Sequence, residues 1–450
     1  MIKRLVLAAT VALMAAGSAA TAAAQPRTPR HQRAPEQQVG HQRAPAQRLR
    51  HRRAPSQPDT VVAFNQLLGQ VLTAPGAQPA TIHPTRTMAI TQIAVYDAVN
   101  GILRDGSPML FGGRGPRHAS ADAAAAAAAR TALDALLPTQ GMVVDAFYAH
   151  ALAQMGSGVT VRAGVRFGER AARAVLADRA QDGASVPPPA FTPQPGPGEY
   201  QLTPPAFAPP GFTQTAHVTP FVLRAPWQFR PAPPPALTSP RYAAAFDEVR
   251  SLGELNSATR TSDQTAIGRF WGAAPIWIVW NQIADQAAVA MGDDLEQNAR
   301  LFAVLDTTLA DGAIALYDAK YAYHRWRPIT AITAADQGNP NTVPDPNWAP
   351  LANTANDPSY PGAHAEFSAA AARVLQAAFR TDAFNFSLSN ATVGITRTFN
   401  SFSQAAAEAS ASRIFAGQHF RFDEDAGQTL GGQVASFVLE HTFMPVRRDH

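Results

Sequence analysis

The sequence contains no cysteine among its 450 residues. Disulfide bonds, thiol nucleophiles and cysteine-ligated metals are therefore excluded. Charged residues are also scarce, at 16% of the chain, whereas hydrophobic residues make up 46%. Beyond residue 24 no stretch is long and apolar enough to span a bilayer, so we expect no transmembrane span in the mature chain. This composition favours a well-buried globular protein of one large domain or a few ordinary ones.

The N-terminus has the pattern of a secretory signal peptide, which we predict over residues 1–24. Lys3 and Arg4 precede an apolar run, and the small residues Ala22-Ala23-Ala24 offer a cleavage site. We therefore expect export, to the periplasm or to the extracellular medium. Residues 25–58 repeat a short His/Arg/Ala/Pro unit every ten residues and contain almost no large apolar side chain, which predicts a disordered basic linker.

The basic character of the chain is confined to this N-terminal region. The formal net charge is +4 for the whole chain, and residues 1–58 carry +9 of it, which leaves −5 for residues 59–450. A mildly acidic body lacks the basic surface that nucleic-acid binding requires. We therefore expect small-molecule partners and no nucleic acid.

Helical patterns dominate the body, and we predict an all-α fold of two helical bundles. Residues 59–185 form the first bundle, with clear starts such as Pro84 and Ser120. Residues 186–240 contain a proline every few positions, which predicts a long connector without regular elements. Helical periodicity resumes over residues 241–450, the predicted second bundle, which contains every motif described below.

The stretch Ser412–Asp423 combines an arginine, an imidazole and a carboxylate within twelve residues. His419 and Asp423 are four residues apart, so on a helix they share a face, and the carboxylate can fix the tautomer of the imidazole. Arg413 brings a planar cation suited to phosphate-like oxygens. Gly417 lets the backbone change direction or pass close to another group. Taken alone, the pattern also fits a surface histidine next to a helix start.

Two further stretches supply cations and a helix start. Lys320 and Arg327 are seven residues apart, two helical turns, and Pro328 predicts that the helix ends at Arg327. Pro358–Gly362 predicts a tight turn before a helix whose N-terminus favours anions, with His364 at its mouth. Together the three stretches predict a site for a small oxyanion such as phosphate or vanadate, held by cations and served by two histidines.

These stretches resemble the signature of the type 2 phosphatidic acid phosphatase and vanadium haloperoxidase superfamily. Its motifs run Lys-x6-Arg-Pro, then Pro-Ser-Gly-His, then Ser-Arg-x5-His-x3-Asp. Lys320–Pro328 matches the first motif and Ser412–Asp423 matches the third. Flanking segments, among them Arg260–Gln264 and Ala94–Val99, resemble the bacterial haloperoxidase-like branch. The resemblance covers residues 60–445 and implies two helical bundles with the active site in the second.

The resemblance also implies a role for each matched residue. His419 would be the axial ligand of vanadium in vanadate, or the nucleophile of a phosphatase. Asp423 would orient His419, and His364 would act as the general acid–base. The residues implied to bind vanadate or phosphate are Lys320, Arg327, Gly362, Ala363, Arg413 and His419.

The sequence departs from the family pattern at two positions. Gly362-Ala363 replaces the Ser-Gly that precedes the histidine, and the lost hydroxyl should weaken oxyanion binding by about 1–2 kcal/mol. Asp357 stands where chloride-oxidising members carry an aromatic residue, and a carboxylate beside a halide pocket would repel halide.

Three functions are compatible with these residues. The first is a vanadate-dependent haloperoxidase that oxidises halide with hydrogen peroxide. The second is a soluble acid phosphatase, without a cofactor, that hydrolyses phosphate monoesters through a phosphohistidine at His419. The third is an anion-binding protein with little turnover, which the departures at Gly362 and Asp357 would favour.

Overall fold

The computed structural model describes residues 58–273 and 275–442 of the chain. The predicted signal peptide, and the basic linker apart from residue 58, lie outside the described residues. Helices dominate the described part, which confirms the predicted all-α class. None of the helices described there has both the length and the apolar character needed to cross a membrane.

The N-terminal helices follow local start signals that the sequence shows plainly. Ser120 caps α3 by accepting the backbone N–H of Ala123 at 3.1 Å, and Pro84 occupies the first position of α2. These helices are α1 (Thr60–Leu72), α2 (Pro84–Leu103), α3 (Ala121–Leu136), α4 (Gly141–Met155) and α5 (Val159–Asp178).

The connector between residues 186 and 240 contains one short 3₁₀ turn, Thr215–His217, and no strand or α-helix before α6. It is held by contacts to α9 instead of by its own backbone ladder. Asp311 of α9 accepts the backbone N–H groups of Phe221, Val222 and Leu223 at 2.6, 2.8 and 2.8 Å. The absence of regular elements agrees with the proline pattern, because proline removes the N–H that such elements need.

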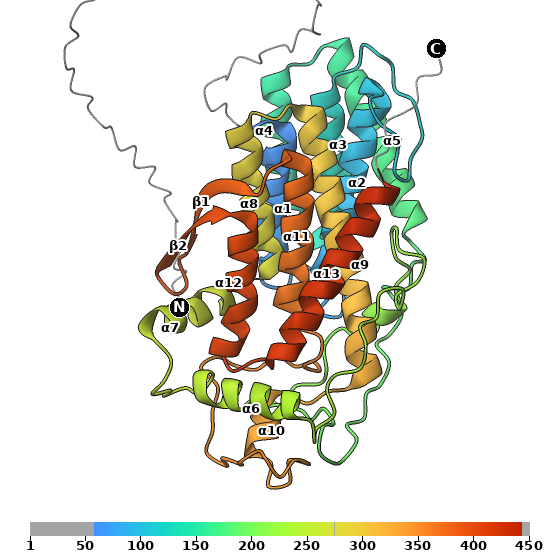
Figure 1. Cartoon of the computed structure of the whole chain (residues 1–450). Helices are drawn as coiled ribbons and strands as arrows, with labels where there is room; N and C mark the ends of the chain where they lie inside the picture. Colours follow the sequence, from blue (N-terminus) through green and yellow to red (C-terminus); the bar gives the residue numbers. More distant parts are fainter. Residues whose placement is uncertain (1–57, 274, 443–450) are drawn as a thin grey trace, which may run out of the picture. The chain divides into compact units, whose positions relative to one another are not determined.

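The C-terminal helices carry the sequence motifs. They are α6 (Pro240–Leu252), α7 (Ser262–Gly272), α8 (Ile276–Met291), α9 (Leu295–Tyr323), α10 (Pro328–Thr333), α11 (Ala363–Phe379), α12 (Phe402–Phe415) and α13 (Arg421–His441). Helices α9, α11 and α13 pack side by side (Figure 1). Gly427 and Gly431 let α13 approach α11 closely, since an added Cβ would lie 2.3 and 2.1 Å from backbone oxygens near or on α11.

A two-stranded antiparallel hairpin interrupts the helices, and the sequence analysis did not anticipate it. Strand β1 (Ala383–Asn390) pairs with β2 (Ile395–Ser401), with Phe386 opposite Phe399. Its signal is the alternation of Phe384, Phe386 and Leu388 with polar residues, which has the period of a strand. The hairpin leads directly into α12, so it places the helix that ends near Arg413.

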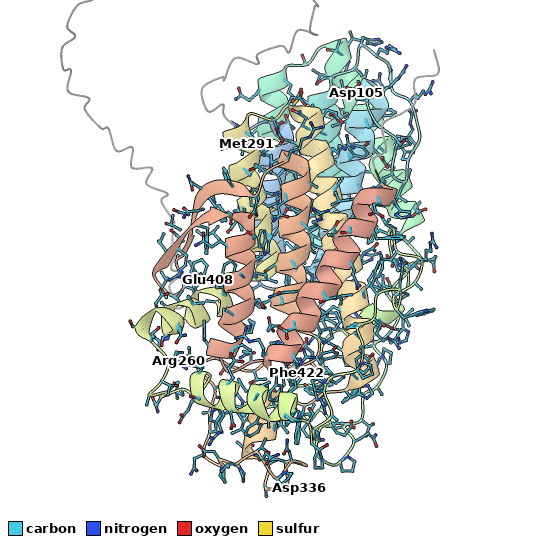
Figure 2. All side chains as sticks on the ribbon, in the orientation of Figure 1. Asp105, Arg260, Met291, Asp336, Glu408 and Phe422 are labelled. Carbon is cyan, nitrogen blue, oxygen red and sulfur yellow. The ribbon has the colours of Figure 1, made fainter. Side chains whose placement is uncertain are left out.

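One end of the C-terminal helices collects the three motifs. Helix α9 ends there, α12 ends there, and α11 and α13 begin there, beside α6 and α10 (Figure 1). Phe422, at the start of α13, marks this end in Figure 2. Backbone bonds tie the segments together, because Gly362 N–H donates to Asp423 O at 2.8 Å and Ser359 N–H donates to Arg325 O at 2.8 Å.

Candidate active site

Lys320 and Arg327 are positioned by the end of α9 and the start of α10. His324 terminates α9 in the left-handed region, at φ 48°, and Arg327 is the N-cap of α10 with Pro328 at the first position. The helix therefore ends before Pro328 as predicted, but at Tyr323, four residues before the predicted end at Arg327, so Arg327 does not lie on the same helix as Lys320. Both side chains are buried, at 0% and 1% exposure, so the two cations face the interior.

Lys320 is held by the loop that precedes α11. Its Nζ donates to Pro358 O and to Ser359 O, the latter at 3.2 Å, and lies 3.6 Å from Asp357 Oδ1. Burial lowers the pKa of Lys320 to about 8, and the nearby Asp357 carboxylate opposes that shift. At neutral pH the side chain is therefore a cation that has lost its water and gained protein oxygens.

Arg327 links the loop before α11 to the loop before α13. Its Nε donates to Asp357 O at 2.8 Å, and its Nη2 donates to Asp357 Oδ1. Its Nη1 donates to Gln418 O at 3.0 Å and to His419 Nε2 at 2.9 Å. Because a guanidinium only donates, Nε2 of His419 is the acceptor in this contact.

His419 is a neutral imidazole whose proton resides on Nδ1. Nδ1 lies 3.2 Å from Asp423 Oδ2 and 3.4 Å from Ser359 Oγ, while Nε2 carries the lone pair. Burial holds the pKa of His419 well below its ordinary value, and Arg327 and Lys320 lower it further. The site thus presents an unprotonated nitrogen among cations, which is what a ligand or nucleophile requires.

The contact between His419 and Asp423 is formed by a different local structure from the predicted one. The two residues do not share a helix face, because His419 lies in the loop before α13 and Asp423 lies in its first turn. Gly417 makes the loop possible at φ 74°, where an added Cβ would lie 2.6 Å from Gly253 O. Asp423 also accepts the N–H of Phe420 at 2.9 Å and the hydroxyl of Ser359 at 2.5 Å.

Asp423 is buried, and burial raises its pKa to about 6, against the opposing effect of its hydrogen bonds. Its partner Ser359 was not singled out from the sequence, although it lies inside the predicted turn Pro358–Gly362. A serine hydroxyl at a turn has many local roles, so only its contact with Asp423 across 64 positions reveals its function. Ser359 fixes the carboxylate that holds the Nδ1 proton of His419.

Arg413 lies in the last turn of α12 and differs from the other two cations. It is 7% exposed, and its Nε and Nη1 atoms have no hydrogen-bond partner among residues 58–273 and 275–442. Burial lowers the pKa of Arg413 to about 10, which Glu424 partly offsets. A buried guanidinium with unused donors is costly unless a charged acceptor joins it, so the residues present fit an oxyanion such as vanadate.

His364 lies in the first turn of α11 and faces α7. Its Nε2 donates to Trp271 O at 3.0 Å, which leaves the lone pair on Nδ1. Burial lowers the pKa of His364 well below its ordinary value, and Arg413 contributes in the same direction. The structure thus brings the second histidine into the field of Arg413.

Gly362 and Ala363 open α11, and the structure restricts what Gly362 can do. Its N–H donates to Asp423 O at 2.8 Å, so this donor is already used and the predicted oxyanion contact of Gly362 through its N–H is not supported. A Cβ at position 362 would lie 2.2 Å from Glu424 Oε1. The space that a serine would need is filled by a neighbouring carboxyl group. The prediction for Ala363 stays a prediction.

Two buried acids complete the site, and the sequence analysis did not foresee their positions. Glu424 lies with Oε1 3.7 Å from His419 Nδ1, accepts from Ser410 Oγ at 3.3 Å, and has its pKa raised by burial to about 8. Asp357, expected beside a halide pocket, lies against Arg327 and Lys320 instead. Neither contact leaves a local sequence signal, because each joins side chains from different segments.

The chain is similar to vanadium haloperoxidases in sequence and in fold. Residues 300–448 match the family model described as the VCPO second helical-bundle domain, a range that contains all the predicted site residues. The chain is 34% identical over 144 residues to the vanadium chloroperoxidase of Curvularia inaequalis, which covers 26% of this chain. That match spans about a quarter of the relative's length, 23%.

Solved structures share the fold across most of the chain. The crystal structure of the first bacterial vanadium-dependent iodoperoxidase matches with a TM-score of 0.75 at 24% identity, covering 87% of this chain and 98% of that one. A holo-type bacterial vanadium-dependent chloroperoxidase matches with a TM-score of 0.64 at 16% identity, covering 87% and 99%. These likenesses concern the arrangement of helices.

Proposed function

This chain belongs to the haloperoxidase-like branch of the type 2 phosphatidic acid phosphatase and vanadium haloperoxidase superfamily, and we propose that it is a vanadate-dependent haloperoxidase. It would use hydrogen peroxide to oxidise bromide, iodide or chloride. Export to the periplasm or the medium is part of the proposal and is supported by the signal-like residues 1–24.

The observation that carries the proposal is the contrast between Arg413 and His419. Arg413 is a buried cation with unused N–H donors, and His419 is a neutral imidazole with its lone pair among cations. A small oxyanion would accept from the free donors of Arg413, and its central atom would replace Arg327 Nη1 on the lone pair of His419 Nε2. Vanadate has this character, and phosphate shares its shape and charge.

Each residue has a defined task in this proposal. His419 would ligate vanadium through Nε2, while Asp423 and Ser359 keep the proton on Nδ1. Lys320, Arg327 and Arg413 would hold the oxyanion oxygens, and Ala363 N–H would add a donor at the start of α11. When bound, vanadate supplies a Lewis acid that activates peroxide towards halide.

His364 would move the proton of the peroxide. In the structure its Nδ1 carries the lone pair and its Nε2 proton is held by Trp271 O. Because its pKa lies below the ordinary range, His364 is neutral and its Nδ1 lone pair is available to accept a proton. It would accept a proton at Nδ1 and return it to the departing oxygen.

The same geometry supports the alternative of an acid phosphatase. His419 Nε2 would attack phosphorus as the ester P–O bond breaks, and His364, once it has taken up a proton at Nδ1, would pass that proton to the leaving alcohol; His364 would then accept a proton from the water that hydrolyses the phosphohistidine. The observation in its favour is again the neutral, carboxylate-oriented imidazole of His419. An anion-binding protein with little turnover remains the third outcome of the test.

The test uses the mature chain in three parallel assays. Orthovanadate is added, and bromination or iodination of a phenol dye with peroxide is measured beside hydrolysis of an aryl phosphate and binding of phosphate. Halogenation that requires vanadate supports the proposal, whereas vanadate-inhibited hydrolysis supports the phosphatase. His419→Ala should abolish either activity, and turnover that survives this change would show that the site is elsewhere.

A further inference from the structure

Asp357 is a buried carboxylate inside the cation cluster. It is 8% exposed, its Oδ1 accepts from Arg327 Nη2 and lies 3.6 Å from Lys320 Nζ, and its Oδ2 accepts from Tyr317 Oη at 3.3 Å. Burial favours the neutral acid, but Lys320 and Arg327 outweigh it and hold the pKa of Asp357 below its ordinary value. The group is therefore an anion at neutral pH.

The three cations of the site differ in how many hydrogen bonds they donate to protein acceptors. Arg327 donates from Nε, Nη1 and Nη2 to protein acceptors, and Lys320 contacts two carbonyl oxygens and Asp357. Arg413 alone among them has Nε and Nη1 without partners. The protein itself thus supplies an anionic oxygen to two cations and leaves the third for another acceptor.

From this arrangement we propose that Asp357 is the site's own counter-anion and a specificity-determining residue for the oxyanion. An incoming oxyanion first meets Arg413 and then replaces the Asp357 carboxylate on Arg327 and Lys320. Because one carboxylate cancels one of three positive charges, Asp357 reduces the advantage that a doubly charged oxyanion would otherwise have over a singly charged one. This inference rests on the proposed oxyanion site and adds its charge preference.

The physical reason for the preference is the charge dependence of the Coulomb term. Breaking the contact between Asp357 and Arg327 costs the same for either anion, whereas repulsion from the displaced carboxylate is proportional to the charge of the bound anion. Removing the carboxylate charge should therefore tighten the binding of both anions, and that of a dianion by the larger factor. A purely structural role of Asp357 would not produce this difference.

The experiment measures the dissociation constants of orthovanadate and molybdate by calorimetry at neutral pH, without peroxide or halide. Orthovanadate is then mainly a monoanion and molybdate a dianion. For Asp357→Asn we expect about tenfold tighter vanadate binding and a larger gain, by a factor of several, for molybdate. Asp357→Ala should show the same order, although the cavity that it leaves reduces both gains.

The matched control is Asp425→Asn. Asp425 lies in α13, two positions after Asp423, but its side chain is exposed and pairs with Arg241 at 3.2 Å on the surface. Solvent screens it, so both dissociation constants should stay within about twofold of wild type. An equal gain in the control would show that net charge alone acts, and would overturn the role of Asp357.

The wild-type protein gives a readout that needs no variant. A crystal structure with vanadate should show Arg327 Nη2 bonded to the oxyanion and Asp357 moved off it. The inference is overturned if Asp357 keeps this bond while the oxyanion is bound, or if folded Asp357→Asn and Asp357→Ala bind both anions no tighter. The proposed function has a separate test. It fails if Asp357→Asn binds vanadate tightly but neither this variant nor the wild-type protein halogenates the dye.

Discussion

Replacing Arg413 by methionine should stabilise the protein and weaken oxyanion binding at once. The side chain is buried with two nitrogens unpartnered among the described residues, and burial lowers its pKa from its ordinary value to about 10. Each pKa unit corresponds to about 1.4 kcal/mol, so the ionised group costs about 3 kcal/mol in the folded state. Methionine has a similar length and no charge, and we expect the free energy of unfolding to rise by about 1–3 kcal/mol.

Oxyanion binding should change in the opposite direction. A charge-assisted bond between a guanidinium and an oxyanion contributes about 2–3 kcal/mol, so the affinity of Arg413→Met for vanadate should fall by about a hundredfold. The increase in melting temperature that vanadate gives wild type should shrink accordingly. Denaturant melts give the stability, and calorimetric scans with and without vanadate give the binding.

Arg373→Met is the matched control for this experiment. Arg373 is an exposed arginine of α11, so its replacement should change both quantities by less than about 0.5 kcal/mol. If Arg413→Met instead destabilised the oxyanion-free protein by more than about 1 kcal/mol, the guanidinium would have favourable partners, and the reasoning from its unused donors would be refuted.

Two further predictions concern buried acids. Burial raises the pKa of Asp306 to about 8, above its unfolded value, so its stabilising effect is complete below about pH 4 and is lost as pH rises through 8. The amide of Asp306→Asn stays neutral and can donate to Asn281 Oδ1, which has no partner among the described residues. The melting temperature of this variant should therefore fall less than that of wild type between about pH 4 and pH 8. An unchanged pH profile would contradict this prediction. Gly362→Ser should lower the free energy of unfolding by about 1–3 kcal/mol, because the new side chain would clash with Glu424. Adding Glu424→Ala should recover most of that loss, which a double-mutant cycle of unfolding free energies measures. Additive effects of the two changes would show that there is no clash.

The sequence was sufficient for helix starts that depend on neighbours in the chain. Pro84 occupies the first position of α2, and Ser120 caps α3 through a side-chain bond to the third residue of the helix. Pro328 separates α9 from α10 and leaves Arg327 between them. The spacing of the motif residues, combined with the family resemblance, also predicted that Asp423 would orient His419, although their shared helix face was wrong.

The sequence was insufficient where one segment fills the space of another. From the local sequence, Gly362 predicts space for an anion next to the backbone, yet the side chain of Glu424 in α13 fills that space. Asp357 reads locally as an acid in a turn, yet it contacts Arg327 across 30 positions. Contacts of this range depend on how the helices pack, and no periodicity or turn pattern records them.

Helix α9 connects the middle of the chain to the chemistry at its end. Asp311 accepts hydrogen bonds from the backbone of residues 221–223. Lys320 lies on the same helix, nine residues or about 14 Å further along. A shift of the connector therefore reaches the lysine through two and a half rigid turns. Residues 221–223, about a hundred positions before Lys320 in the sequence, are therefore linked to this lysine through a single helix.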